Sequence, residues 1–213
     1  MSLIVCETFY SLMGESTAAG LPAFFIRLTG CNLRCRYCDT PYAYEGGEER
    51  SVEGLVALAM ACPARLALVT GGEPLLQAET LVLLAQLADA GFTVFLETNG
   101  SLPIRDVDSR VRRIVDVKCP GSGMEQHNYW PNLELLAPRD EIKFVISHRS
   151  DFDWALNIIK EHDLTSRIPV LISPVFGVVM PRDAAAWILA SGLPLRLNLQ
   201  LHKFIWGPDV RGV

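Results

Sequence analysis

The amino-acid sequence predicts an α/β protein whose sheet is largely parallel. Short runs rich in Val, Ile, Leu and Phe recur along the chain and mostly lack the polar alternation of a half-exposed sheet, which favours buried strands. Helical patterns lie between several of these runs, and polar motifs directly follow most of them. Strands and helices that alternate at this length indicate a parallel sheet built from crossover units.

Seven apolar runs are predicted to be strands: Ala23–Leu28, Leu66–Thr70, Thr93–Glu97, Ile114–Val117, Ile142–Ser147, Val170–Ser173 and Leu195–Leu201. Four segments are predicted to be helices: Val52–Cys62, Ala78–Ala90, Phe152–Glu161 and Arg182–Ala190. Gly91 and Gly192 follow the second and fourth helical segments, where a glycine commonly ends a helix.

Two connections, Ser101–Arg113 and Pro120–Asp140, are too short or too irregular for a full helix. The sequence therefore predicts an incomplete, distorted parallel β/α barrel with few outer helices, rather than a regular eightfold one. The 213 residues contain no internal repeat, low-complexity tract or linker, and their number suits about one domain. We expect residues 1–213 to form a single domain.

The overall composition is that of a soluble globular protein, with 50% hydrophobic and 20% charged residues. A net charge of −5 argues against a broad nucleic-acid-binding surface. Met1–Tyr10 lacks the basic start and apolar run of a signal peptide, and no stretch approaches the roughly 18 apolar residues of a membrane span. We expect a cytoplasmic protein with neither nucleic acid nor membrane as a partner.

Three of the six cysteines, Cys31, Cys35 and Cys38, form a C-x3-C-x2-C motif in the segment TGCNLRCRYCDT, with no fourth cysteine nearby. Three thiolates can hold three corners of a [4Fe–4S] cluster and leave the fourth iron open to an outside ligand. Closed iron–sulfur and structural zinc sites normally use four protein ligands. An open iron can take part in chemistry as well as carry electrons.

Two other interpretations of the motif remain open. Zinc would need a fourth ligand from elsewhere, such as His127 or His202, and a closed four-cysteine electron carrier would have to recruit Cys119. The spacing is unusual for zinc and matches neither common ferredoxin pattern. Cys6, Cys62 and Cys119 are otherwise expected to be small buried hydrophobic residues.

Polar motifs follow six consecutive predicted strands: the cysteine loop, GGEP, TNG, Lys118 with PGSG, Ser147–His148 and Ser173–Pro174. In parallel α/β folds, ligands gather beyond the carboxyl ends of the strands. The motifs are therefore expected to form one site.

The cysteine motif, followed by Gly71-Gly72-Glu73-Pro74, resembles that of the radical S-adenosylmethionine (SAM) superfamily. In that superfamily SAM chelates the open iron, and the reduced cluster cleaves it to a 5′-deoxyadenosyl radical that abstracts hydrogen from substrate. The resemblance implies a barrel of the radical SAM type, with a [4Fe–4S] cluster and SAM as cofactors. It also implies SAM contacts at Tyr37, Cys38, Asp39, Gly72, Glu73, Lys118, Ser122 and Ser173. Asp116-x-Lys118 is similar to an aspartate–lysine pair that reaches the ribose or the methionine carboxylate in some members.

A narrower resemblance extends over nearly the whole chain. The segments ETFYSLMGES, TGGEP, ETNG, DVKCPGSG and QLHKFIWG resemble those of the 7-carboxy-7-deazaguanine synthase family of the queuosine pathway. This resemblance implies conversion of 6-carboxytetrahydropterin to 7-carboxy-7-deazaguanine with loss of ammonia. It also implies a Mg²⁺ requirement, a homodimer and a reducing electron donor that is flavodoxin or ferredoxin-like.

The resemblance also implies roles for individual residues. Glu15 pairs with the amidine-like edge of the pterin, Arg27 binds its 6-carboxylate and Thr40 is a Mg²⁺ ligand. The substrate-binding set is Leu12, Met13, Gly14, Glu15, Arg27, Thr70 and the C-terminal Val213. Met13 stands where the family usually has Gln, which leaves only backbone contacts there.

Two rival functions remain possible at this stage. A glycyl-radical-enzyme activase also carries C-x3-C-x2-C and GGEP, but it needs no small-molecule cage, and Glu15 and Arg27 favour the pterin enzyme. A non-enzymatic iron–sulfur or zinc module is the other class. Gln200, His202 and Lys203 follow a predicted strand, and their roles stay open.

Overall fold

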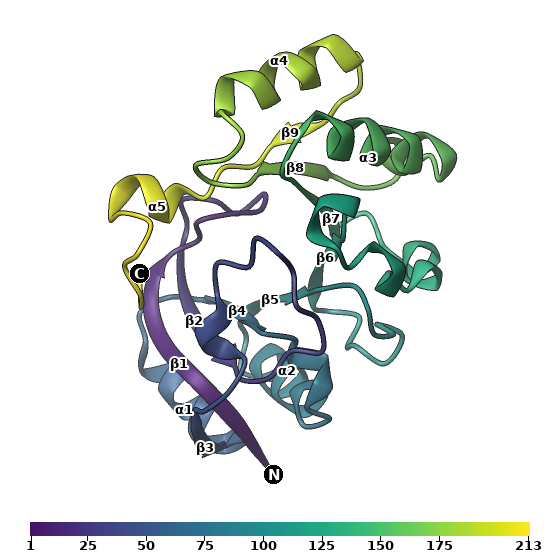
Figure 1. The fold of residues 1–213 in the computed structure, drawn as a ribbon. Helices are drawn as coiled ribbons and strands as arrows, with labels where there is room; N and C mark the ends of the chain where they lie inside the picture. Colours follow the sequence, from purple (N-terminus) through teal and green to yellow (C-terminus); the bar gives the residue numbers. More distant parts are fainter.

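The structure is a computed structural model that describes residues 1–213. They form one nine-stranded sheet whose strand order is β3-β1-β2-β4-β5-β6-β7-β8-β9, and Figure 1 shows how it curves, with helices on its outer side. The strands are β1 (Ser2–Leu12), β2 (Pro22–Leu28), β3 (Glu48–Ser51), β4 (Leu66–Gly71), β5 (Thr93–Thr98), β6 (Arg112–Val117), β7 (Glu141–Ile146), β8 (Val170–Pro174) and β9 (Arg196–Leu197). The helices are α1 (Val52–Ala61), α2 (Thr80–Asp89), α3 (Arg149–Glu161), α4 (Pro181–Ser191) and α5 (Leu201–Ile205).

The sheet is parallel from β2 through β9, and only β1 runs antiparallel to its two neighbours. It does not close, since β3 and β9 are its two edges. These findings confirm the predicted α/β class and the incomplete, mostly parallel barrel with few helices. None of the helices combines the length and the apolar character that crossing a membrane requires.

Successive side chains of each strand point to opposite faces, which separates two cores. The outer face packs against the helices through a large apolar cluster that includes Ile26, Val69, Leu96 and Phe144. The inner face has a smaller apolar cluster, which includes Phe25, and polar side chains follow it toward the carboxyl ends of the strands. The inner face is itself apolar over most of each strand and carries a polar side chain only near the carboxyl end, so the sequence of a strand reads as an apolar run.

The loop between β1 and β2 reaches across the open side of the barrel. The backbone N–H of Ser16 donates to Asn198 Oδ1 at 2.8 Å, and Thr17 donates to the buried Glu141 at the start of β7. The N–H of Leu201 donates to the carbonyl of Gly14 at 2.9 Å. The loop therefore ties the first strands to the last ones, although no strand pairing closes the barrel.

Most of the predicted elements are confirmed to within a few residues, but Leu195–Leu201 is wrong as a seven-residue strand. Only Arg196–Leu197 pairs, on one side, with β8. Asn198 then turns its amide toward the β1–β2 loop, and α5 begins at Leu201. The sequence analysis also missed β1, β3 and α5. Ser101–Arg113 holds no helix and Pro120–Asp140 holds only short 3₁₀ turns, as expected.

Candidate active site

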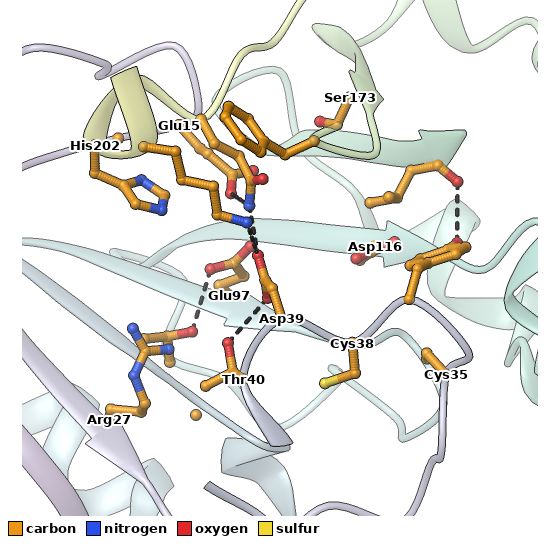
Figure 2. A pocket seen from close by; sticks show the side chains of 18 of the residues that line it. Glu15, Arg27, Cys35, Cys38, Asp39, Thr40, Glu97, Asp116, Ser173 and His202 are labelled. Atoms are coloured by element: carbon orange, nitrogen blue, oxygen red, sulfur yellow. Dashed lines mark hydrogen bonds and ion pairs between the residues drawn. The ribbon is translucent and has the colours of Figure 1, made fainter. Parts of the chain in front are cut away.

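A cavity of about 810 Å³ opens at the carboxyl ends of the parallel strands. The cysteine loop lies along one side of it, and the C-terminal segment, including α5, lies along another. Figure 2 shows Cys35 and Cys38 on their loop, with Ser173 and His202 across the cavity and Glu97 and Asp116 between them. Residues of five of the six polar motifs therefore line this end of the barrel, some of them through backbone rather than side chains. Ser147–His148 is the exception, because it does not line the cavity: Ser147 Oγ donates to Asp151 and the His148 ring contacts Ser150.

The cysteine loop is held by backbone hydrogen bonds to its neighbours. The N–H of Gly30 donates to the carbonyl of Ala43 at 2.8 Å, and the N–H of Arg36 donates to that of Ser122 at 3.1 Å. Cys31, Cys35 and Cys38 are all free, half-buried and part of the cavity lining. No group of three or more His, Cys, Asp or Glu side chains is placed to hold a single metal ion.

The outlying cysteines behave differently. Cys119 is fully buried in the outer core, as predicted, whereas Cys6 and Cys62 are only half-buried. Cys119 does not line the cavity, so the structure does not bring it to the other three as a fourth ligand.

The GGEP loop packs directly on the cysteine loop. A side chain at Gly72 would meet the carbonyl oxygen of Gly30 at 2.1 Å and the Cβ of Cys31 at 2.9 Å. Gly72 lines the cavity, but the Glu73 side chain does not. The buried Glu73 carboxylate accepts hydrogen bonds from the backbone N–H of Asn99 at 2.6 Å and from the hydroxyl of Thr98 at 2.8 Å. Glu73 thus ties the GGEP loop to the TNG loop behind the cavity wall.

Asp116 and Lys118 stand side by side on the inner face at the end of β6. Lys118 Nζ donates to Asp116 Oδ2 at 2.8 Å, and both residues are at most 9% exposed. Burial alone would lower the pKa of Lys118, but Asp116 and Cys35 hold it above its usual value. Asp116 Oδ1 is buried and has no hydrogen-bond partner in the protein. Such an atom needs a donor, and a ribose hydroxyl or an amino group of a bound molecule would supply one.

The remaining candidate contacts for SAM divide into two groups. Tyr37 and Ser173 line the cavity; Tyr37 donates its hydroxyl proton to the carbonyl of Val145 at 3.0 Å, and Ser173 Oγ accepts from Asn198 Nδ2 at 2.8 Å. Ser122 is fully buried and does not line the cavity. Its hydroxyl donates to the carbonyl of Cys119 at 2.6 Å and so stabilises the turn after β6.

Arg27 lies on β2 with its side chain only 17% exposed. Its Nε donates to Glu7 Oε1 at 2.7 Å from the neighbouring strand, and Tyr42 donates its hydroxyl proton to the same oxygen at 3.1 Å. This is the internal salt bridge expected of a buried arginine, but it uses only Nε. The two Nη atoms have no partner in the protein, so the forked end of the guanidinium remains available within the cavity lining.

Glu15 belongs to a buried network that centres on Lys143. Lys143 Nζ contacts Glu15 Oε2 at 3.2 Å and forms a shorter ion pair with Glu97. Burial alone would raise the pKa of Glu97, but Lys143 outweighs it and keeps that pKa below its usual value. Thr70 donates to Glu97 at 3.1 Å, and Asn198 donates to Glu15 at 3.1 Å. Lys143 and Glu97 were missed by the sequence analysis, although each is a lone charge within an apolar run.

The other substrate-binding candidates lie around the β1–β2 turn. Leu12, Met13 and Gly14 all line the cavity. The side chain of Met13 is buried in the inner apolar cluster, and both its backbone N–H and carbonyl are bonded within the turn, to Leu21 and Gly20 at 2.8 Å. Met13 thus shapes the turn. The His202 ring packs so closely on Gly14 that a Cβ at this position would lie 2.1 Å from His202 Nδ1, which excludes any larger residue.

The C-terminal segment lies against the cysteine loop through polar contacts. Lys203 Nζ and Gln200 Nε2 donate to Asp39 Oδ2 at 2.6 and 2.7 Å, and Thr40 donates to the other oxygen of Asp39 at 3.0 Å. The guanidinium of Arg211 stacks 3.9 Å from the centre of the Tyr42 ring. Val213 also lines the cavity. These contacts give Gln200 and Lys203 a place in the site that the sequence left open.

Comparisons with known proteins agree on one family. The model of the radical SAM superfamily matches residues 25–181. The chain is 45% identical to the 7-carboxy-7-deazaguanine synthase of Chlorobaculum tepidum, over 99% of this chain and 97% of that protein. It is 42% identical to the synthase of the same name from Koribacter versatilis, over 98% and 99% of the two chains. The crystal structure of QueE from Escherichia coli superimposes with a TM-score of 0.78 at 25% identity, over 94% of each chain.

Proposed function

The chain belongs to the radical SAM superfamily and, within it, to the 7-carboxy-7-deazaguanine synthase family, and we propose that it converts 6-carboxytetrahydropterin to 7-carboxy-7-deazaguanine with loss of ammonia. One observation carries this assignment. A single cavity is lined by three cysteines that lack a fourth partner, by a buried guanidinium with free Nη atoms and by a carboxylate network. An activase of a protein substrate would not need such a cage of buried charges.

The donor set on one side of the cavity fits a [4Fe–4S] cluster with SAM. Three thiol side chains supply three ligands, and the unpaired Asp116 Oδ1 suits a hydroxyl or amino donor of SAM. When bound, the two cofactors supply a radical that abstracts a hydrogen atom from the substrate. Cys38, Asp39 and Gly72 line this side as well, so their backbone groups are assigned to SAM.

Four side chains are assigned to this cofactor from different elements. Tyr37 flanks the adenine, Asp116 and Ser173 accept or donate hydrogen bonds, and the Lys118 ammonium faces a carboxylate or a cluster thiolate. Glu73 and Ser122 are assigned an indirect role, because their side chains bond to backbone groups behind the cavity wall.

The other side of the cavity suits the pterin. The two Nη donors of Arg27 match the two oxygens of a 6-carboxylate, and a guanidinium binds a carboxylate through both. Glu15 accepts hydrogen bonds from the amidine-like edge of the ring system. Thr70, Leu12, Met13, Gly14 and the C-terminal Val213 complete the pocket.

Magnesium is assigned to Thr40, whose hydroxyl lines the cavity beside the Asp39 carboxylate. A hydroxyl is a weak ligand, but Mg²⁺ commonly takes most of its ligands from water and substrate oxygens. The substrate carboxylate held by Arg27 would be such a ligand. The homodimer, the cytoplasmic location and a flavodoxin or ferredoxin-like electron donor are proposed on the family resemblance alone.

The decisive experiment is an anaerobic turnover assay of the reconstituted protein with the pterin, SAM, Mg²⁺ and a reductant. Mass spectrometry should detect a product that has lost ammonia from the pterin, and no product should form when SAM is left out. Formation of 5′-deoxyadenosine without any pterin product, in repeated preparations with a full cluster, would overturn the assignment.

A further inference from the structure

Lys143 is a charged side chain on the inner face of the barrel, where it lines the cavity beside partly exposed carboxylates. It projects from the middle of β7 and is 5% exposed. Three carboxylates from three other segments surround its ammonium group: Glu97 from β5 in direct contact, Glu15 from the β1–β2 loop at 3.2 Å and Asp116 from β6 at 4.0 Å. Neither the reaction proposed above nor the roles assigned to individual residues make any use of this lysine.

The charged side chains of the cavity do not balance, because Lys143 is the only cation there in direct contact with two carboxylates, Glu15 and Glu97. Arg27 is matched by Glu7 and Lys118 by Asp116, each pair through one direct contact. Glu15 and Glu97 have only Lys143 between them, and their remaining bonds come from the neutral groups of Asn198, Gln200 and Thr70. One negative charge is therefore left over on this side of the cavity.

A buried carboxylate without a counter-charge is costly, so the surplus needs a partner. A ligand that carries several N–H donors on one edge, as an amidine-like or guanidine-like heterocycle does, supplies that partner. The direction of the donors matters too, because a carboxylate can only accept hydrogen bonds. The shared lysine fixes the direction in which both carboxylates point.

We propose, on the basis of the assigned function, that Lys143 is the positioning residue of the substrate pocket. It holds Glu15 and Glu97 as one rigid acceptor pair, and the single charge that it leaves uncompensated selects a heterocycle with an N–H donor edge. Lys143 acts through the two carboxylates and does not touch the reacting atoms. Its contribution belongs to substrate binding and not to SAM, since its closest contact on the SAM side is the one at 4.0 Å.

The test compares four proteins in the anaerobic turnover assay, with the concentrations of pterin and of SAM varied separately. They are the wild type, Lys143→Met, the charge-balanced double variant Lys143→Met/Glu97→Gln and the control Lys160→Met, which makes the same change at an exposed position of α3. In Lys143→Met the KM for the pterin should rise at least about tenfold, because two carboxylates lose their common partner. The KM for SAM should change less than about twofold in the same variant.

Two further readouts separate positioning from mere structural support. Lys143→Met should form more 5′-deoxyadenosine per product than the wild type, because a poorly oriented substrate lets the radical escape. The double variant should recover part of the pterin KM, since it removes one charge of each sign. The control should match the wild type in both constants.

Other outcomes overturn the proposal. A pterin KM within twofold of wild type in Lys143→Met does so, and so does a parallel rise of both KM values with no recovery in the double variant. If Lys143→Met does not fold, the double variant is compared with Glu97→Gln alone, and equal pterin KM values then exclude a role for Lys143. If the wild type makes no pterin product, the assigned function itself is wrong. If the wild type is active and Lys143→Met has the same pterin KM, only the role of Lys143 is wrong.

Discussion

Two parts of the cavity are built in different ways. The strand wall consists of the inner-face residues Arg27, Thr70, Glu97, Asp116 and Lys143, whose positions follow from the register of the sheet. The loop-and-tail cover consists of residues 31–40 and 200–213. The wall is mostly buried, with side-chain exposures of 7% for Lys143 and 26% for Glu97, whereas the cover includes the Asp39 side chain, which is 44% exposed.

This difference in burial decides how much free energy each ion pair contributes. A charge removed from the wall leaves its partner buried and uncompensated, which costs about 3–5 kcal/mol in other proteins. An ion pair at a solvent-exposed surface contributes about 0–1 kcal/mol. We therefore expect the wall to decide what the cavity binds and the cover to contribute less. Cofactor ligands are the exception, because the cysteines lie in the cover.

The largest effect is expected from the cover, which is the exception to the expectation that changes in the wall matter more. Cys35→Ala removes one of the three proposed ligands to the cluster, so both product formation and SAM cleavage should disappear. Iron and sulfide content, together with 5′-deoxyadenosine formation, measure this directly. Cys62→Ala, at a half-buried cysteine outside the cavity, is the control and should keep both activities. A Cys35→Ala protein that still cleaves SAM would exclude the cysteine assignment.

The next effect tests the wall. Arg27→Ala removes the assigned partner of the substrate carboxylate and leaves Glu7 unpaired, so kcat/KM for the pterin should fall by about a hundredfold to a thousandfold. SAM cleavage should continue without coupling to product. Arg50→Ala removes an exposed arginine paired with Glu48 and should leave both rates unchanged. Normal product formation by Arg27→Ala would show that another group binds the carboxylate.

The wall was also the part of the site that the sequence described least completely. Arg27 was assigned through the family resemblance, and it is also the single charge in the run AFFIRLTG. Lys143 and Glu97 are likewise the single charges in IKFVIS and TVFLE, but only the sheet register shows that their side chains share the inner face. A strand whose inner face is apolar except at its carboxyl end looks like a continuous apolar run.

The cover shows the opposite limitation. Its cysteine motif stood out from spacing alone, because the three proposed ligands lie in one short loop. The contacts of Gln200 and Lys203 with Asp39 join residues more than 160 positions apart, and no local pattern encodes them. The strand predicted at Leu195–Leu201 failed for the same reason, since Asn198 is drawn into long-range hydrogen bonds.

The proposed Mg²⁺ site lies between the two parts of the cavity, with Thr40 in the cover and Arg27 in the wall. Thr40→Val removes the assigned hydroxyl ligand at nearly constant shape, and the Mg²⁺ concentration needed for half-maximal rate should rise about tenfold. Thr40→Ser keeps a hydroxyl and should stay close to the wild type. Titration of metal-depleted enzyme with Mg²⁺ measures both. An identical Mg²⁺ response of Thr40→Val and wild type would place the ion elsewhere.

The smallest effect is expected from the clasp, by which we mean the ion pair between Asp39 and Lys203. Partial desolvation opposes ionisation of Asp39, but Lys203 outweighs it, with hydrogen bonds from Gln200 and Thr40, and the pKa of Asp39 lies well below its usual value. A depressed carboxylate pKa means that the contribution is fully present above the unfolded-state value of about 4 and is lost only as pH falls below it. The ratio of wild-type to Asp39→Asn activity should therefore stay constant between about pH 6 and 9.

A double-mutant cycle then measures how much this clasp contributes. Asp39→Asn and Lys203→Met should each lower kcat/KM for the pterin by about two- to fivefold, and the double variant should lose little more than either single one. High salt should reduce the coupling, because Asp39 is close to half-exposed. Coupling that stays the same at high salt, with losses near those of Arg27→Ala, would mean that the clasp is desolvated when substrate binds. In that case the cover would behave like the wall once the cavity is filled, and the contrast between them would hold only for the empty protein.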